Sequence, residues 1–220
     1  MSQQAGRSDF ELRLVWLPDD DLKADLTTLN RFFEIVSEYD LDLAQPALGA
    51  GSYVAHDITL RRPRMRLRFT TFVEIMAACF SRRALELCQP YLGATISSWG
   101  PNHFFLRLLG YPDRKIAIID ETSVIHTRPP HRGPNSALAV SQGASPQDEL
   151  NQFLQMHGLE PRFETFGAID RKGNFVRDLS EIDRHKAHWR SFNGDSSVRQ
   201  MLNPRRLVRG LKRLFSLAQR

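Results

Sequence analysis

Three consecutive aspartates, Asp19, Asp20 and Asp21, are the residues whose type and spacing most directly suggest chemistry in this chain. Three carboxylates at one point concentrate negative charge, which is costly unless a cation or free backbone amides compensate it. Residues two apart on an extended chain point the same way, so Asp19 and Asp21 could share one metal ion. The alternative is that the aspartates cap a helix beginning near Leu22, where acids suit the helix dipole. Spacing alone leaves both interpretations open.

Glu74 is a second candidate, because it lies inside the otherwise apolar run 72–80. A carboxylate in such a run has buried partners, is protonated, or faces a cleft. We therefore treat Glu74 as a candidate site residue. The alternative is that it faces solvent at a sheet edge or pairs with a nearby arginine, such as Arg66 or Arg68.

Two further candidates come from a turn and a strand end. The turn Ser97-Ser98-Trp99-Gly100-Pro101-Asn102 places a large aromatic ring on flexible backbone, which would suit the floor beneath a sugar ring. The alternative is that Trp99 packs into the core. His126 follows a short strand at 123–125, where an imidazole could reach a metal or a phosphate, although a purely structural histidine fits the pattern as well.

These residues must be positioned by an α/β fold, because strand and helix patterns alternate along the chain. The aspartates follow a strand with period-two alternation and precede a stripe of apolar residues at helical spacing. The segment 129–145 is rich in proline, glycine and serine and is predicted to be a loop at a boundary. The expected strands are 10–17, 41–45, 66–70, 72–80, 115–120, 163–169 and 174–176, and the expected helices are 22–38, 81–89, 104–109 and 145–157.

Length and composition limit the class of protein. The chain has 220 residues, of which 41% are hydrophobic and 25% charged, and this balance predicts one main folded unit rather than a disordered or fibrous chain. No apolar run approaches the roughly 20 residues that cross a bilayer, so we expect a cytoplasmic protein. Cys79 and Cys88 are too few for a disulfide framework and are expected to be buried thiols.

The basic charge is concentrated at the C-terminal end. The net charge is +5, but residues 199–220 alone carry seven lysines and arginines and no acid. The rest of the chain is slightly acidic, which does not favour nucleic acid as a partner. A basic amphipathic helix at 205–220 would suit the anionic inner face of a membrane, or else would pack its apolar stripe on the domain.

Six segments taken together resemble a known family. Over about residues 10–131, their sequences and their order along the chain resemble the domain-of-unknown-function-707 family. The proteins of this family look like GT-A glycosyltransferases. The segments are Trp16-Leu17-Pro18-Asp19-Asp20-Asp21-Leu22, Leu43-Ala44-Gln45-Pro46-Ala47-Leu48, Phe72-Val73-Glu74-Ile75-Met76-Ala77, Trp99-Gly100, Lys115-Ile116-Ala117-Ile118-Ile119-Asp120 and His126-Thr127-Arg128-Pro129.

The resemblance implies a fold and a set of roles. It implies a partial GT-A-like mixed sheet flanked by helices at 1–130. The residue patterns themselves predict a small α+β extension at 131–195 and the basic helix at 196–220. A sugar nucleotide and an acceptor would be the substrates, with Mn²⁺ or Mg²⁺ as cofactor. The implied residues are Asp19, Asp21 and His126 for the metal, Trp99, Gly100 and Arg128 for substrate, and Glu74 and Asn102 for catalysis.

Two departures from the family pattern bear on activity. The family's Trp-Gly-Leu-Asp appears as Trp99-Gly100-Pro101-Asn102, and an amide cannot serve as a general base. Only 18 residues precede the aspartates, whereas a GT-A domain builds its nucleotide-binding strands before that motif. We therefore expect either a metal-dependent glycosyltransferase-like protein or a non-catalytic binding remnant of one.

Overall fold

The structure, a computed structural model, describes residues 13–130 and 132–183. The chain divides into two units, Met1–His185 and Lys186–Arg220, and all described residues belong to the first. The basic helix expected at 196–220 and the beginning of the first expected strand lie outside the described residues. Within them, no helix is long and apolar enough to cross a membrane.

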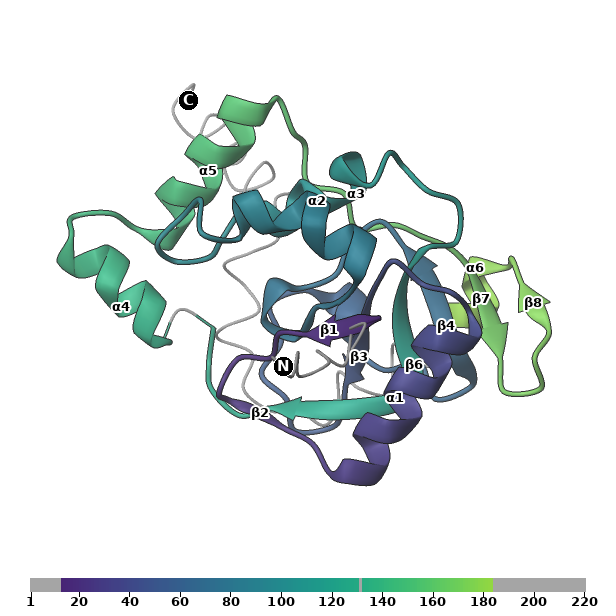
Figure 1. Cartoon of the computed structure of the whole chain (residues 1–220). Coiled ribbons are helices and arrows are strands. Elements are labelled where there is room, and N and C mark those ends of the chain that lie inside the picture. Colours follow the sequence, from purple (N-terminus) through teal and green to yellow (C-terminus); the bar gives the residue numbers. More distant parts are fainter. Residues whose placement is uncertain (1–12, 131, 184–220) are drawn as a thin grey trace, which may run out of the picture. The chain divides into compact units, whose positions relative to one another are not determined.

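The described residues form a mixed α/β fold with one sheet (Figure 1). The strands lie in the order β1-β5-β3-β6-β4-β7-β8, and β2 pairs separately with β6. β3 and β6 run parallel, whereas the other pairs are antiparallel. The α/β class expected from the sequence is confirmed. The strands are β1 (Leu14–Trp16), β2 (Leu22–Lys23), β3 (Leu43–Leu48), β4 (Met65–Thr70), β5 (Cys79–Ser81), β6 (Ile116–His126), β7 (Thr165–Asp170) and β8 (Phe175–Val176).

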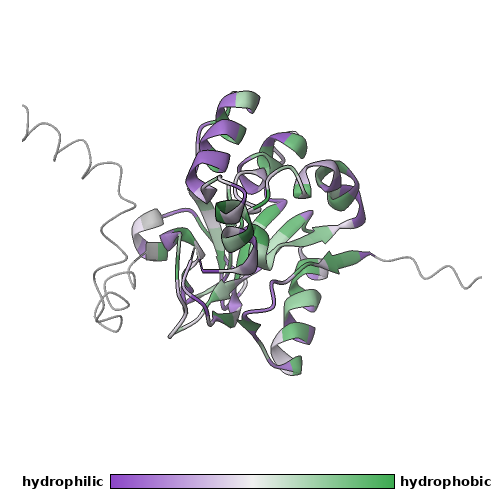
Figure 2. Cartoon of the chain, turned by 90° about the vertical axis from the view of Figure 1, so that its left-hand side faces the viewer, coloured by the Kyte–Doolittle hydropathy of each residue, from purple (hydrophilic) through white to green (hydrophobic). Residues whose placement is uncertain are grey.

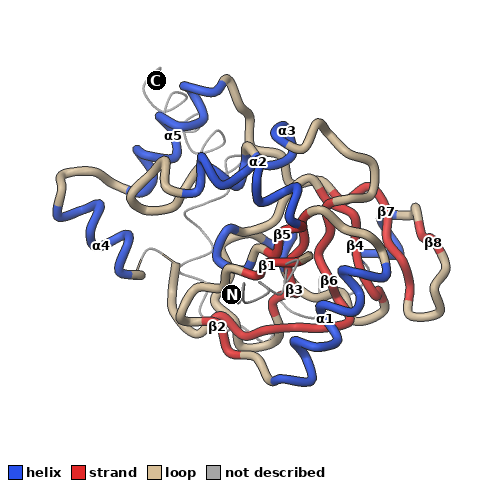
Figure 3. Tube along the Cα trace, viewed as in Figure 1, coloured by secondary structure: helices blue, strands red, loops and turns tan. Residues whose placement is uncertain are grey.

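Helices lie on both sides of the strands (Figure 3). The α-helices are α1 (Leu26–Glu38), α2 (Arg82–Leu92), α3 (Phe105–Leu108), α4 (Pro134–Ser141), α5 (Pro146–His157) and α6 (Leu179–Asp183), and the 3-10 helices are η1 (Asp57–Thr59), η2 (Ile75–Ala77) and η3 (Pro101–His103). The strands are mainly hydrophobic, whereas the helices carry hydrophilic and hydrophobic residues together (Figure 2).

Alternation along the strands assigns each helix to a face. On β6, Ala117 and Ile119 join the cluster around Phe32 and Ile35 of α1, whereas Ile116 joins the cluster of α2 and α3 on the opposite face. Successive residues of a strand point to opposite faces, so this one strand contributes to both layers. Each buried aliphatic or aromatic side chain stabilises the fold by roughly 1.5–3 kcal/mol relative to exposure.

The helix after the aspartates starts later than expected. α1 begins at Leu26, and its cap is Asp25, whose carboxylate accepts a hydrogen bond from the Thr28 amide at 2.7 Å. Leu22 and Lys23 instead form β2, which pairs with β6. The interpretation of Asp19–Asp21 as a helix cap is therefore wrong.

The apolar run 72–80 is not a central strand. It enters η2 at Ile75, and only Cys79–Ser81 pairs as β5. The backbone amide of Glu74 donates to the Gln45 side chain of β3 rather than to a neighbouring strand. Apolarity here reflects burial in three clusters, since Phe72, Cys79 and Phe80 each pack in a different one.

Two strands are longer than the sequence indicated. β3 continues through Pro46 to Leu48, and its register against β6 shifts between Pro46 and Ala47. Proline is tolerated within sheets at such irregularities. β6 joins the expected segments 115–120 and 123–125 into one strand that ends at His126. Both cysteines are free and buried, as expected.

The segment after residue 130 adds to the same sheet. β7 pairs with β4 and β8 pairs with β7, which confirms the expected hairpin. α5 is capped by Ser145 and ends at Gly158, also as expected. The predicted loop 129–145 is wrong in part, because it contains α4.

Candidate functional site

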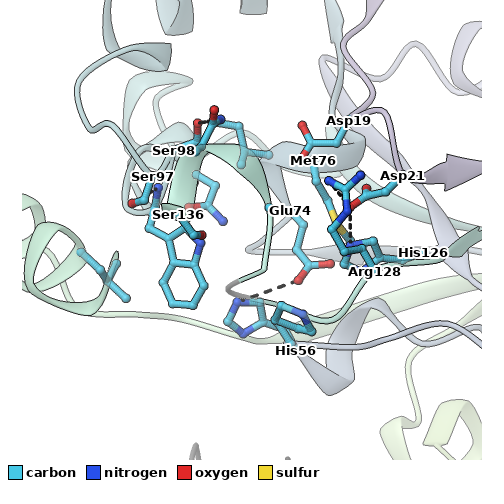
Figure 4. Close-up of a pocket in the computed structure, with 18 of the residues that line it drawn as sticks. Asp19, Asp21, His56, Glu74, Met76, Ser97, Ser98, His126, Arg128 and Ser136 are labelled. Carbon is cyan, nitrogen blue, oxygen red and sulfur yellow. Dashed lines mark hydrogen bonds and ion pairs between the residues drawn. The ribbon is translucent and has the colours of Figure 1, made fainter. Parts of the chain in front are cut away.

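One cavity of about 260 Å³ collects every candidate residue that the sequence suggested. The lining comes from loops after β1, β6 and α2, from the segment around η2, and from α4 and α5. Figure 4 shows Asp19, Asp21 and Arg128 on one side and Ser97, Ser98 and Ser136 on the other, with Glu74 between them. The candidates in this lining are Asp19, Asp21, Glu74, Trp99, Gly100, Asn102, His126 and Arg128.

Pairing of β2 with β6 brings Asp21 to His126. Leu22 lies opposite His126 in that pairing, and the Thr127 amide and hydroxyl both donate to the Asp21 carbonyl at 2.9 Å. As a result, Asp21 Oδ2 lies 3.4 Å from His126 Nε2, and both side chains are more than nine-tenths buried. The other carboxylate oxygen, Asp21 Oδ1, is buried and has no hydrogen-bond partner among the described residues.

The backbone orients His126. Its Nδ1 lies 2.9 Å from the Tyr53 carbonyl oxygen, which can only accept, so Nδ1 carries the proton. In the neutral ring this leaves the Nε2 lone pair facing Asp21 and the cavity. A backbone carbonyl that fixes the histidine tautomer in this way is usual behind metal-binding imidazoles.

Arg128 supplies positive charge beside the aspartates. Its Nη1 lies 3.2 Å from Asp20 Oδ1 and 3.5 Å from Asp21 Oδ2. Its side chain is one-third exposed and lines the cavity, so it can also face an anionic ligand. The hydrogen bond to Asp20 is the main reason why the pKa of Arg128 is raised.

Asp19 lies at the cavity with its backbone anchored. Its amide donates to the Met76 carbonyl at 2.8 Å, which joins the aspartate loop to η2. Although Asp19 keeps exposed surface, partial desolvation raises its pKa, and the negative charges of Asp21 and Asp20 raise it further. Crowding of carboxylates is thus only partly compensated by His126 and Arg128.

Glu74 faces the cavity as a buried carboxyl group. Its side chain is 8% exposed, and Oε2 has no hydrogen-bond partner in the described part of the chain. Burial raises the pKa of Glu74 to about 8, partly offset by the Thr59 hydroxyl. The alternative pairing with Arg66 or Arg68 is wrong, because those arginines pair with Glu121, Glu38 and Asp120.

Glu149 of α5 holds the opposite wall in place. Its carboxylate accepts from the amides of Ile96 and Ser97 at 2.9 and 2.8 Å, and these bonds lower its pKa against the opposing effect of desolvation. The Thr95 hydroxyl donates to the Trp99 carbonyl. The turn that carries Trp99 is therefore tied at several points and is not freely flexible.

Gly100 allows this turn to pack against α5. Its φ is +116°, and a Cβ there would lie 2.9 Å from Phe153. Both the backbone conformation and the contact exclude larger residues. Asn102 follows in η3, is 9% exposed, and lines the cavity, so it places an amide and not a carboxylate at this point of the lining.

The donor set at the aspartates fits a hard divalent cation in chemistry. Carboxylate oxygens and one neutral imidazole suit Mn²⁺ or Mg²⁺, and the unpartnered Asp21 Oδ1 is available as a ligand. Within the described residues, no group of three His, Cys, Asp or Glu side chains is gathered closely enough to hold a metal ion alone. A cation would therefore need oxygen ligands from the substrate or from water as well.

Sequence reasoning missed several residues of the cavity. His56, His103 and Ser136 also line it. His56 and His103 are isolated histidines without a spacing pattern, and Ser136 lies on α4, which was read as loop. Only the fold places them with the aspartates.

Comparisons with known proteins do not assign the chain to a family. The described residues form an open mixed sheet with flanking helices, and the cavity is lined by both polar and apolar side chains. No family model, curated protein or solved structure matches the chain.

Proposed function

We propose that the protein is a glycosyltransferase-like enzyme whose cavity binds the diphosphate and sugar of a sugar nucleotide with a divalent cation. The main support for this proposal is that eight residues converge on one cavity. The sequence pattern had singled them out in separate segments between Asp19 and Arg128. Such convergence of polar groups in a concave site is typical of ligand binding and catalysis.

The charged residues on one side of the cavity would bind the cation and the diphosphate. Asp19 and Asp21 would hold Mn²⁺ or Mg²⁺, with His126 as an auxiliary ligand. Arg128 would contact the diphosphate, since its side chain is already at the aspartates and reaches the cavity. When bound, the cation would neutralise charge on the departing diphosphate.

The opposite wall would hold the sugar and the acceptor. Trp99 and Gly100 form a tied turn there, and the Asn135 amide donates to the Ser98 hydroxyl at the same wall. An aromatic ring with small polar groups around it suits a hydroxylated ring. Glu74 lies between this wall and the aspartates (Figure 4).

A non-catalytic binding protein is the second candidate, and Asn102 favours it. An amide cannot accept the proton of an acceptor hydroxyl. If no other group takes that proton, the cavity would retain binding without transfer.

Calorimetric titration with Mn²⁺ tests the cation part of the proposal. We expect a saturable heat with the wild-type chain that disappears in the Asp19→Ala/Asp21→Ala variant, because both carboxylates are removed. Asp113→Asn, a change at an exposed aspartate, is the matched control and should bind as the wild type does. Equal heats in all three proteins, or no heat in any of them, would contradict the proposal that Asp19 and Asp21 bind a cation.

A further inference from the structure

A carboxyl group and an imidazole face each other in the cavity lining. His56 Nε2 lies 4.0 Å from Glu74 Oε1, as the dashed line in Figure 4 marks. The second oxygen, Glu74 Oε2, is buried without a hydrogen-bond partner among the described residues. One oxygen of Glu74 thus faces the imidazole, while the other is left for a ligand.

Aromatic rings restrict the orientation of His56. The Phe163 ring stacks on the imidazole at a centroid distance of 4.8 Å and 24°, and the Phe72 ring meets it edge-on at 4.8 Å and 71°. Phe72 precedes η2, and Phe163 lies in the segment between α5 and β7. Two distant segments therefore clamp His56 beside Glu74, with its side chain still 31% exposed.

The surroundings leave both groups uncharged at neutral pH. Burial raises the pKa of Glu74 to about 8, and the Asp19 charge adds to this. Burial lowers the pKa of His56 to about 4, His103 lowers it further, and Asp57 opposes the shift. A neutral carboxyl group is a proton donor and a neutral imidazole an acceptor, so the pair is complementary.

Resting on the proposed function, we propose that Glu74 and His56 form a proton relay that receives the proton of the acceptor hydroxyl, the task that Asn102 cannot perform. The separation of 4.0 Å exceeds hydrogen-bond length. Catalytic hydrogen bonds are often long before substrate binds and tighten in the complex, and the relay requires the Glu74 carboxyl group to approach the clamped imidazole in this way.

In the proposed transfer, each bond that forms is matched by a bond that breaks. The acceptor oxygen forms a bond to the anomeric carbon, and the bond from that carbon to the diphosphate oxygen breaks, with its electron pair leaving on the diphosphate. The acceptor proton passes to Glu74 Oε2 while the proton on Oε1 passes to His56 Nε2. Glu74 remains neutral, and His56 becomes imidazolium and later releases the proton to water.

The pH profile of sugar transfer distinguishes a relay from a structural role. We expect His56→Gln to lower kcat by about 100-fold between pH 5 and 7, with little change in KM. Above pH 8 the defect should shrink, because ionised Glu74 can accept the proton itself. His157→Gln changes a histidine at the end of α5 that is not part of the cavity lining, and this control should keep the wild-type rate.

A spectroscopic measurement on the ligand-free chain accompanies the kinetics. The infrared carbonyl stretch of a protonated carboxylic acid should vanish with a midpoint near pH 8 in the wild type and should be missing in Glu74→Gln. This measurement does not require a substrate, and it does not depend on whether the His56→Gln variant folds. A band that is already absent at pH 6 would overturn the relay.

The outcomes separate the relay from the proposed function. Turnover that depends on Asp21 but is unchanged in His56→Gln, or a His56→Gln defect that is the same at every pH, would overturn the relay alone. Absence of turnover by the wild type with every sugar nucleotide and acceptor tried would overturn the proposed function, and the relay with it.

Discussion

At the scale of single residues, Glu74 is a carboxyl group whose buried environment disfavours its ionised form. Its backbone amide donates to the Gln45 side chain, and its carboxyl-bearing side chain is only 8% exposed to solvent. Burial then favours the neutral form and raises the pKa to about 8. A group held in this state costs stability whenever the unfolded chain is ionised and the folded chain is not.

This cost predicts how stability depends on pH. Because the folded pKa lies above the ordinary value of 4.5, the cost is absent below about pH 4.5, grows as pH rises to about 8, and is constant above that. Glu74→Gln removes the ionisable group and should raise the free energy of unfolding by about 2–4 kcal/mol at pH 8 but by little at pH 4.5.

Urea unfolding at the two pH values measures this difference. Glu160→Gln, which changes an exposed glutamate, is the control and should leave stability within about 0.5 kcal/mol at both. A benefit of Glu74→Gln that is equal at pH 4.5 and pH 8 would argue against a neutral Glu74.

The sequence alone pointed to some residues of the cavity and not to others. The triple aspartate and a glutamate in an apolar run are conspicuous, because local charge in such contexts demands compensation. His56 gives no such signal, since its relation to Glu74 depends on Phe72 and Phe163, which meet only in the fold. Long-range packing of this kind is not encoded in any short window.

Among the elements, β4 and β6 share a buried ion pair that fixes the sheet behind the cavity. Arg68 Nε lies 2.7 Å from Asp120 Oδ2, and both side chains are at most 1% exposed. The guanidinium also donates to the carbonyls of Ile58 and Leu60, which anchors η1. The pair therefore links two strands to the segment that follows His56.

Breaking this pair should be costly. Arg68→Met removes the guanidinium that bonds both oxygens of the buried Asp120 and leaves mainly Arg62 to compensate its charge, so it should lower the free energy of unfolding by about 3 kcal/mol or more. Arg66→Met on the same strand removes partly exposed pairs with Glu121 and Glu38 and should cost about 1 kcal/mol or less. Denaturant titrations of both variants give the comparison, and similar losses for the two would contradict the assignment of the buried pair.

Helices with clear caps were predictable, whereas segments set by tertiary contacts were not. Ser145 and Gly158 bound α5 as their residue types indicate. The run 72–80 has the composition of a strand, but Gln45 takes the Glu74 amide and the chain turns into η2. α4 was missed because its flanking glycine and proline residues dominate the local composition.

For the whole described unit, the mixed sheet makes the cavity possible. The aspartate loop and His126 meet through β2 and β6, although more than 100 residues separate Asp21 from Thr127 in the chain. Strand order cannot be read from one sequence, so the sequence predicted an α/β class and candidate residues but not their convergence. Their convergence on one cavity is the main support for a shared function.

The most direct test of that function is hydrolysis of a panel of sugar nucleotides in the presence of Mn²⁺. We expect sustained release of nucleotide from at least one donor, lowered by about 100-fold or more in Asp21→Asn and unchanged in Asp113→Asn. No release from any donor, or equal release by wild type and Asp21→Asn, would contradict the proposal that the aspartate side of this cavity acts on sugar nucleotides.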